Sequence, residues 1–297
     1  MERKPNIGWI GVGKMGLPMS RNLLKAGFPL SAFDIDKAAL QEISKHGAQI
    51  SGSAKALAEQ AAVIVSTVPD DAALESVTIG EEGFFKHAKA GTTYIDMSTV
   101  SPALSARIGA EAQKNGIRHL RAPVSGSTES ANAGSLTILV SGPKEAFEQC
   151  LGVFKVLGQK VFHVGTSDEA RYLKLLVNMM VGITSAMTAE ALIFGKKGGL
   201  DWNQMIDIIN NSVVASPLVG FKAQLLKEKK FPAAFSVSQM SKDFDLALET
   251  GKTLDIPLPI TSLTRQLFGA MKATGRGSMD YFGLVSLLEE MAGIKKE

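Results

Sequence analysis

Residues 6–16 read NIGWIGVGKMG, an apolar run that leads directly into three glycines. A short apolar run that ends in turn residues is typical of a buried strand. Gly11, Gly13 and Gly16 fit the spacing G-x-G-x-x-G, and an apolar helical pattern follows them. In such a turn the first glycine permits the tight bend, the second lets a pyrophosphate approach the backbone, and the third lets the helix pack on the strand. The segment therefore predicts a dinucleotide-binding strand, turn and helix. A tight turn without a ligand is the alternative.

A carboxylate follows the next predicted strand. Leu30–Phe33 is apolar and is followed by Asp34, about 20 residues after the turn, where dinucleotide folds place the acid that binds the ribose hydroxyls. A carboxylate repels a 2′-phosphate, and Ile35 stands where a phosphate-binding arginine could have been. We therefore predict NAD rather than NADP. The alternative is that Asp34 ends the strand or caps the next helix, a role that Asp36 could also fill.

Further strand patterns alternate with helical patterns through the first half of the chain. Predicted strands cover residues 62–68, 92–97, 119–122, 136–140 and 161–164, and a predicted helix covers residues 102–115. This alternation predicts right-handed βαβ units and a largely parallel, doubly wound sheet. Ligands of such sheets bind beyond the carboxyl ends of the strands. Val68, Pro69 and Thr99 lie at these ends.

The segment that follows the predicted strand at residues 119–122 is small and rich in hydroxyl groups. Residues 122–128 read APVSGST. Backbone N–H groups and hydroxyls at Ser125, Gly126 and Ser127 could hold a small carboxylate. A polar surface turn is the alternative.

Residues 169–198 form one long helical pattern that is apolar on almost every side, which indicates a buried helix. Its length would allow a membrane span, but Asn178 and Glu190 argue against one. Lys174 and Asn178 lie one turn apart on one face. A lysine beside so much hydrocarbon is costly unless it has a partner or a task, and burial lowers the pKa of a lysine toward the range useful for proton transfer. The alternative is a lysine that reaches water at the helix start.

Strand patterns end where this helix begins. Helical patterns follow at residues 202–212, 218–229, 238–254, 260–273 and 281–291, with glycine and proline between them. We predict an NAD-binding Rossmann-type α/β domain over residues 1–165. An all-helical substrate and oligomerisation domain follows over residues 166–297, joined to the first by the long helix. Lys174 and Asn178 then lie near the domain junction, where small-molecule sites are common.

Composition excludes several other classes of protein. The net charge is +3 over 297 residues, and its interspersed signs give no nucleic-acid-binding footprint. Cys150 is the single cysteine, so an internal disulfide and a cysteine metal site are excluded. The four histidines stand in no ligand spacing. We therefore predict a cytoplasmic protein with no metal, nucleic-acid or membrane partner.

Five motifs stand in one order along the chain. They are GVGKMGLPMSRNL at residues 11–23, DMST at 96–99, APVSGS at 122–127, KLLVN at 174–178, and Lys242-Asp243. With these motifs the chain resembles the β-hydroxyacid dehydrogenases over nearly its whole length. That family includes 3-hydroxyisobutyrate dehydrogenase, tartronate and succinic semialdehyde reductases and 2-(hydroxymethyl)glutarate dehydrogenase, with 6-phosphogluconate dehydrogenase as a more distant relative.

The resemblance implies a hydride transfer between NAD and a small 3-hydroxy acid of the 3-hydroxyisobutyrate type. It makes Lys174 the general acid and base, has Asn178 orient the substrate, and assigns the substrate carboxylate to the loop of Ser125, Gly126 and Ser127. The implied cofactor contacts are Gly11, Val12, Gly13, Lys14, Met15, Gly16, Asp34, Val68, Pro69, Thr99 and Lys242. A homodimer or homotetramer is also implied.

Alternatives stay open at this point, and the sequence departs from the family pattern. The alternatives are a semialdehyde reductase, a phospho-sugar acid dehydrogenase, a 2-(hydroxymethyl)glutarate-type dehydrogenase, and a nucleotide-binding protein without catalysis. Val12 stands where leucine is usual, Arg121 where the family usually has aspartate, and Ser127 where a second glycine is common. Asp168-Glu169-Ala170 replaces a glycine-rich start of the catalytic helix. No departure removes a catalytic group, and all bear on the choice of substrate.

Overall fold

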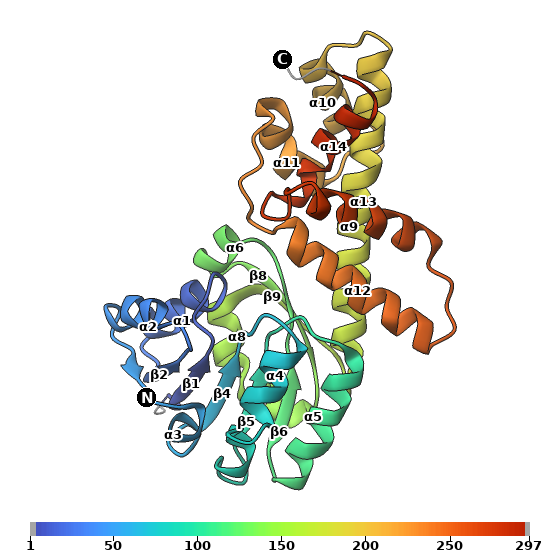
Figure 1. Ribbon diagram of the computed structural model, residues 1–297. Coiled ribbons are helices and arrows are strands. Elements are labelled where there is room, and N and C mark those ends of the chain that lie inside the picture. The colour runs from blue at the N-terminus through green and yellow to red at the C-terminus, as the bar shows by residue number, and fades with distance from the viewer. Residues whose placement is uncertain (1–3, 295–297) are drawn as a thin grey trace. The chain divides into compact units, whose positions relative to one another are not determined.

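The structure is a computed structural model that describes residues 4–294. Its contacts divide the chain into two compact units, Met1–Lys174 and Leu175–Glu297. The division falls inside helix α9 (Glu169–Lys197), the long helix of Figure 1. The sequence places the boundary just before this helix, at residue 165.

In the described part of the first unit, nine strands form one mixed sheet. In chain order these are β1 (Ile7–Ile10), β2 (Leu30–Phe33), β3 (Gln49–Ile50), β4 (Val63–Ser66), β5 (Thr93–Asp96), β6 (Arg118–Arg121), β7 (Val124–Ser125), β8 (Leu136–Ser141) and β9 (Gly158–Gly165). The spatial order is β3-β2-β1-β4-β5-β6-β8-β7, and β9 pairs with β8. The first six strands are parallel, whereas β8 runs antiparallel to β6 and β7. The predicted doubly wound sheet is confirmed.

Helices cover both faces of this sheet (Figure 1). They are α1 (Gly16–Lys25), α2 (Lys37–Ser44), α3 (Ala54–Ala58), α4 (Asp71–Thr78), the 3-10 turn η1 (Phe84–Lys86), α5 (Pro102–Lys114), α6 (Thr128–Asn132), α7 (Lys144–Gln149) and α8 (Leu151–Leu157). Successive strand residues point to opposite faces. Trp9 accordingly packs in one apolar core with Met19 and Leu23, and Ile10 packs in another with Leu57 and Tyr94.

The second unit is helical, as predicted. Its helices are α10 (Trp202–Asn210), α11 (Pro217–Glu228), α12 (Val237–Thr253), α13 (Pro259–Ala273), the 3-10 turn η2 (Tyr281–Gly283) and α14 (Leu284–Met291). Ser216 and Ser236 cap α11 and α12 by accepting bonds from backbone N–H groups, the usual way of satisfying a helix start. Phe244 and Phe268 meet edge to face in the core, with ring centroids 5.5 Å apart.

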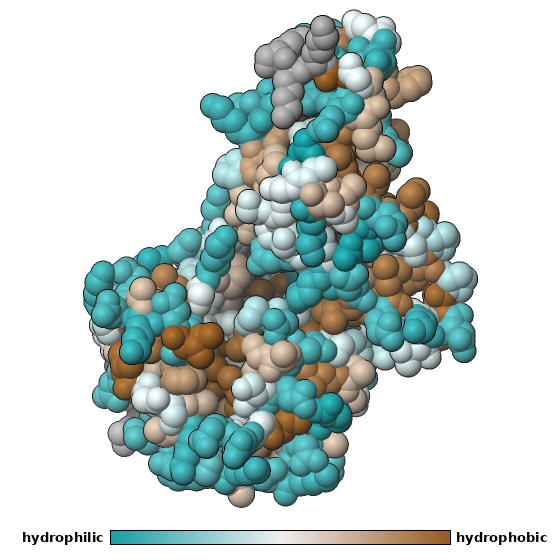
Figure 2. Space-filling view, viewed as in Figure 1, coloured by the Kyte–Doolittle hydropathy of each residue, from teal (hydrophilic) through white to brown (hydrophobic). Residues whose placement is uncertain are grey.

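Helix α9 carries an apolar stripe on the surface of the single chain, where the sequence predicts burial on all sides. By length and composition it could cross a membrane, and 39% of its most apolar window is buried. Tyr172, Leu176, Met180, Met187 and Phe194 are exposed at intervals of four or seven residues, so they follow one face of the helix. Figure 2 shows apolar surface along the edge of the second unit on which α9 runs in Figure 1.

Candidate active site

The three glycines of the turn after β1 are explained by different features of the structure. Gly11 has a φ of +86°, and a Cβ there would lie 2.3 Å from the Thr67 carbonyl oxygen. A Cβ on Gly16 would lie 1.9 Å from the Gly11 carbonyl oxygen, whereas a Cβ on Gly13 would meet no atom within 4 Å. The fold thus requires glycine at the first and third positions. The open face at Gly13 suits the close approach of a pyrophosphate, so the turn fits NAD.

This contrast gives a matched pair of variants. Gly13→Ala should leave the fold intact and raise the Kd for NAD about tenfold or more, which corresponds to a loss of about 1.4 kcal/mol, because the new methyl group enters the space for the pyrophosphate. Gly16→Ala adds the same methyl group against the backbone and should lower the thermal unfolding midpoint. Calorimetric titration with NAD and thermal unfolding measure the two effects. Unchanged NAD affinity in Gly13→Ala would contradict the assignment of this turn.

Asp34 lies beside the glycine turn, at the carboxyl end of β2. Its Oδ2 accepts a hydrogen bond from the Val12 N–H at 2.7 Å, and its Oδ1 accepts one from the Asp36 N–H at 2.9 Å. Asp36 is the residue that caps α2, by accepting a bond from the Ala38 N–H. The capping alternative for Asp34 is therefore wrong. Ile35, the next residue, is 92% exposed and offers no positive charge to a 2′-phosphate.

The other first-unit residues predicted to contact NAD lie at accessible positions. In the glycine turn, Lys14 is exposed and Met15 is half-buried. After β4 and β5, Pro69 is exposed and Val68 and Thr99 are half-buried. Since β4 and β5 are neighbouring parallel strands, the last three residues lie at one edge of the sheet.

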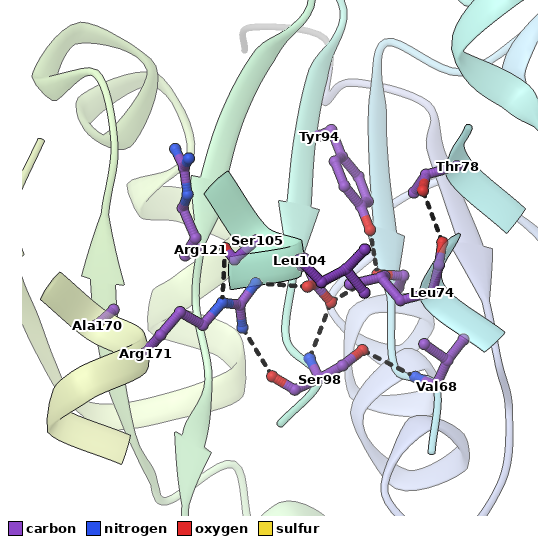
Figure 3. A network of polar contacts seen from close by, with 12 residues as sticks. Val68, Leu74, Thr78, Tyr94, Ser98, Leu104, Ser105, Arg121, Ala170 and Arg171 are labelled. Carbon is purple, nitrogen blue, oxygen red and sulfur yellow. Dashed lines mark hydrogen bonds and ion pairs between the residues drawn. The ribbon is translucent and has the colours of Figure 1, made fainter. Parts of the chain in front are cut away.

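Asp96, the last residue of β5, organises this edge. It is fully buried, and its Oδ1 accepts hydrogen bonds from the Ser66 hydroxyl at 2.9 Å and the Ser98 N–H at 3.0 Å. The Ser98 hydroxyl in turn accepts a bond from the Val68 N–H at 3.0 Å (Figure 3). The segments after β4 and β5 are therefore fixed to each other through one carboxylate.

The predicted substrate loop is partly an edge strand. Ser125 is the last residue of β7, which pairs with β8, so strand pairing holds its backbone. Gly126 is exposed with a φ of +142°, and a Cβ there would lie 2.8 Å from the Leu136 side chain. The Ser127 hydroxyl accepts a bond from the Ser130 N–H at 3.3 Å and caps α6. Ser127 thus has a structural role that the sequence did not predict.

Two departures from the family pattern meet in the structure. The Arg121 Nε donates to the Asp168 Oδ1 at 2.9 Å, and their side chains are 8% and 13% exposed. Burial lowers the pKa of Arg121, and the Asp168 carboxylate opposes that shift. A Cβ on Gly109 would lie 2.2 Å from the Arg121 Nη2, so glycine in α5 leaves room for the guanidinium. Arg121 therefore ties the end of β6 to the residue before α9.

The remaining predicted residues lie on α9 and α12. Lys174 is half-buried, and Asn178, one turn further along α9, is 5% exposed. The Asn178 amide donates a hydrogen bond to the Asp243 Oδ2, and the Lys242 Nζ lies 3.1 Å from the Asp243 Oδ1. Asp243 is 2% exposed, so this part of α12 is not a fully solvated helix turn. Asp243 fixes the amide of Asn178.

The sequence did not predict a role for one buried side chain near these residues. Arg171, in the first turn of α9, is 1% exposed and pairs with Asp96. The signal was an arginine three residues before Lys174 in a strongly apolar helix, but its partner is far away in the sequence.

Comparison with known families matches both halves of the chain. Residues 6–165 match the NAD binding domain of 6-phosphogluconate dehydrogenase. Residues 169–288 match the family described as NAD-binding of NADP-dependent 3-hydroxyisobutyrate dehydrogenase. The two matches cover the glycine turn and Asp34 in the first case, and Lys174, Asn178 and Lys242 in the second.

Individual relatives match over nearly their full lengths. 2-(Hydroxymethyl)glutarate dehydrogenase of Eubacterium barkeri is 36% identical, covering 99% of this chain and 98% of the relative. 2-Hydroxy-3-oxopropionate reductase of Escherichia coli is 32% identical, covering 97% and 99%. The structure of Mycobacterium tuberculosis 3-hydroxyisobutyrate dehydrogenase with L-serine matches with a TM-score of 0.89 at 25% identity, covering 96% and 99%. The chain belongs to the β-hydroxyacid dehydrogenase family and is an NAD-dependent oxidoreductase that acts on the CH–OH group of hydroxy acids.

Proposed function

We propose that this enzyme transfers a hydride between NAD and a small 3-hydroxy acid of the 3-hydroxyisobutyrate type, with Lys174 as the general acid and base. The observation that carries the proposal is the pairing on α9 of a half-buried lysine with an asparagine one turn away. The buried Asp243 carboxylate holds the amide of that asparagine, Asn178. A fixed amide can orient a substrate beside the proton-transfer group.

Bound NAD supplies the hydride acceptor, and the chain supplies the proton transfer and the orientation. In oxidation, neutral Lys174 would take the proton of the substrate hydroxyl, and the hydride would leave the carbon that bears this hydroxyl. In reduction, the ammonium form of Lys174 returns a proton to the developing alkoxide. The backbone and hydroxyls around Ser125, Gly126 and Ser127 bind the substrate carboxylate, and Asn178 bonds to the substrate beside the reacting carbon. The cofactor is held by the glycine turn and by five further residues, Asp34, Val68, Pro69, Thr99 and Lys242.

A second candidate substrate is 2-(hydroxymethyl)glutarate. The relative from Eubacterium barkeri that carries this name is 36% identical over almost the whole chain. The candidate has the same hydroxyl-bearing carbon placed β to a carboxylate, together with a second carboxylate. Both candidates therefore undergo the same reaction, and they differ in the part of the molecule away from the reacting carbon.

The experiment that tests the proposal is NADH formation at mildly alkaline pH. The panel is 3-hydroxyisobutyrate, 2-(hydroxymethyl)glutarate, glycerate, 3-hydroxypropionate, serine, threonate and 4-hydroxybutyrate. The highest kcat/KM is expected for an acid with its hydroxyl on the β-carbon. A preference for 4-hydroxybutyrate would favour the succinic semialdehyde reductase alternative. No turnover of any compound by protein that binds NAD would leave the non-catalytic alternative.

Asp34 provides a separate test of the cofactor assignment. Asp34→Ala should raise the Kd for NAD about 10- to 100-fold, because hydrogen bonds to a charged group contribute about 1.5–3 kcal/mol. The variant should also bind NADP better than the wild type does. Asp36→Ala is the matched control, since it removes a helix cap and should lower stability without changing the cofactor preference. A wild-type ratio of NAD to NADP affinity in Asp34→Ala would refute the role.

We also propose that the enzyme is a cytoplasmic homodimer or homotetramer. The exposed apolar stripe of α9 supports this proposal, because a second copy of the chain could bury these side chains and the burial of apolar surface is favourable. Sedimentation equilibrium measures the subunit number. A monomer at micromolar concentration would contradict this part of the proposal.

A further inference from the structure

A buried arginine connects the first turn of α9 to the edge of the sheet where β4 and β5 end. The Arg171 Nη2 lies 2.5 Å from the Asp96 Oδ2, and the two side chains are 1% and 0% exposed. The Arg171 Nη1 donates to the Ser98 carbonyl oxygen at 2.8 Å, and its Nε donates to the Ser105 hydroxyl at 3.1 Å. Figure 3 shows the guanidinium reaching from α9 to these groups. One side chain thus contacts β5, the segment that follows it, and α5.

Stability alone is a poor explanation for this arrangement. The desolvation cost of a buried ion pair can match or exceed its electrostatic gain, and apolar side chains of similar size often stabilise a core at least as well. A guanidinium differs from an apolar side chain in geometry, since its planar set of donors fixes direction as well as distance. At Arg171 all three kinds of guanidinium nitrogen have a buried acceptor. The contact therefore sets orientation.

The Arg171 contact joins two parts of the proposed active site within the first unit, the sheet edge where β4 and β5 end and the first turn of α9. On the sheet side, Ser98 precedes Thr99 and its hydroxyl accepts a hydrogen bond from the Val68 N–H, so both segments predicted to contact NAD belong to the network. On the helix side, Lys174 follows Arg171 by three residues, which is about one turn of α9.

A second buried pair fastens the same helix start. Asp168 directly precedes α9, and its carboxylate accepts the hydrogen bond from the Arg121 Nε at 2.9 Å. Arg121 is the last residue of β6, next to β5 in the sheet. The start of α9 is thus held at the ends of two neighbouring strands. Arg171 extends from α9 to Asp96 at the end of β5, and Arg121 extends from the end of β6 to Asp168.

We propose that Arg171 is a positioning residue for hydride transfer. It fixes the first turn of α9, and with it Lys174, to the end of β5, which is joined to the segment after β4 and so to Val68 and Thr99, two of the proposed NAD contacts. The inference rests on the proposed function, in which Lys174 exchanges a proton with the substrate. Arg171 itself touches neither substrate nor cofactor.

The test compares the wild type with Arg171→Lys, which keeps the charge but replaces the planar donor set with a point ammonium. We expect kcat to fall about 10- to 100-fold, the size of effect that misplacement of about 1 Å produces. The calorimetric Kd for NAD and the substrate KM should change less than about threefold, since ground-state binding is retained. The deuterium isotope effect on kcat, measured with substrate deuterated at the oxidised carbon, should rise because hydride transfer becomes more rate-limiting.

Two further variants make the result decisive. Arg265→Lys makes the same substitution in an arginine–aspartate pair of the second unit, where the Arg265 Nε lies 2.7 Å from the Asp245 Oδ1, and it should leave kcat unchanged. Ser105→Ala removes only the acceptor of the Arg171 Nε and keeps the ion pair. It should fold and lower kcat about 3- to 10-fold, as the loss of one hydrogen bond predicts.

Several outcomes would overturn the inference. One is a wild-type kcat in both Arg171→Lys and Ser105→Ala. Another is a Kd for NAD that weakens by the same factor as kcat, which would mean that Arg171 only supports the cofactor site. If Arg171→Lys fails to fold, Ser105→Ala decides alone. Lys174→Ala measured alongside separates the two hypotheses. Activity in Lys174→Ala would remove the proposed function, whereas its inactivity beside fully active Arg171 and Ser105 variants would remove only the positioning role.

Discussion

Replacement of Lys174 by alanine is expected to lower kcat by about 10²- to 10⁴-fold, the usual contribution of a general acid–base group. The Kd for NAD should stay close to the wild-type value. The reason is that the proposed NAD contacts lie elsewhere in the chain: the glycine turn joins β1 to α1 and Asp34 follows β2, whereas Lys174 lies on α9. Stopped-flow kinetics and calorimetric titration measure the two quantities. An active Lys174→Ala enzyme, or one that no longer binds NAD, would contradict the assignment.

Three companion measurements show whether the loss concerns proton transfer. Lys174→Arg keeps a positive charge but cannot act as a base, because a guanidinium does not lose its proton in proteins, so it should be nearly as inactive as the alanine variant. Lys197→Ala makes the alanine substitution at an exposed position near the end of the same helix and should be fully active. Methylamine added to Lys174→Ala should restore part of the rate, and more of it at higher pH, where more of the amine is neutral.

Most of the fold could be predicted from the sequence because its signals are local. The apolar run before the glycine turn predicted the position of β1, and the alternation of strand and helix patterns predicted the parallel sheet. The helices of the second unit begin and end within a few residues of the predicted limits, except that residues 281–283 form a 3-10 turn before α14. The two-residue strands β3 and β7 were missed, since so few residues show no period and are held only by their neighbours.

The candidate site was predictable only where one motif carries the chemistry. Lys174 and Asn178 stand four residues apart, so the sequence alone places them on one helix face. The ion pairs that surround the start of α9 join residues about 50 to 75 positions apart, and no local pattern announces them. Arg121 and Asp168 illustrate the point, because each alone reads as an unexplained departure from the family pattern. The structure explains both by pairing them.

The second large effect is expected in the second unit, at a buried ion pair. The Lys222 Nζ lies 2.6 Å from the Asp280 Oδ2, and the side chains are 4% and 0% exposed. The ammonium also lies 5.0 Å from the ring centroid of Tyr281, a favourable cation–π distance. Burial, together with the nearby Asp280 carboxylate, raises the pKa of Tyr281, which is the behaviour of a poorly hydrated environment.

Lys222→Met is expected to lower the free energy of unfolding of this unit by about 3–5 kcal/mol, because it leaves a buried carboxylate without a counter-charge. Urea denaturation followed by fluorescence measures it. The chain has two tryptophans, Trp9 in the first unit and Trp202 in the second, so a Trp9→Phe background makes Trp202 the reporter of the second unit. Lys227→Met is the matched control in the same unit. Lys227 pairs with Asp207, whose side chain is 60% exposed, so the change should be at most about 1 kcal/mol.

The double variant Lys222→Met/Asp280→Asn distinguishes a stranded charge from lost packing. Asparagine keeps an oxygen that can accept the bond from the Phe282 N–H, which Asp280 now accepts at 3.1 Å, and it removes the negative charge. If the stranded carboxylate causes the loss, the double variant should be more stable than Lys222→Met by about 1–3 kcal/mol, the cost of leaving a buried polar group unsatisfied. If lost contacts of the lysine chain with the surrounding rings cause it, the two variants should unfold at the same urea concentration. A double variant less stable than Lys222→Met would mean that Asp280 stabilises the unit through its other bonds, independently of Lys222.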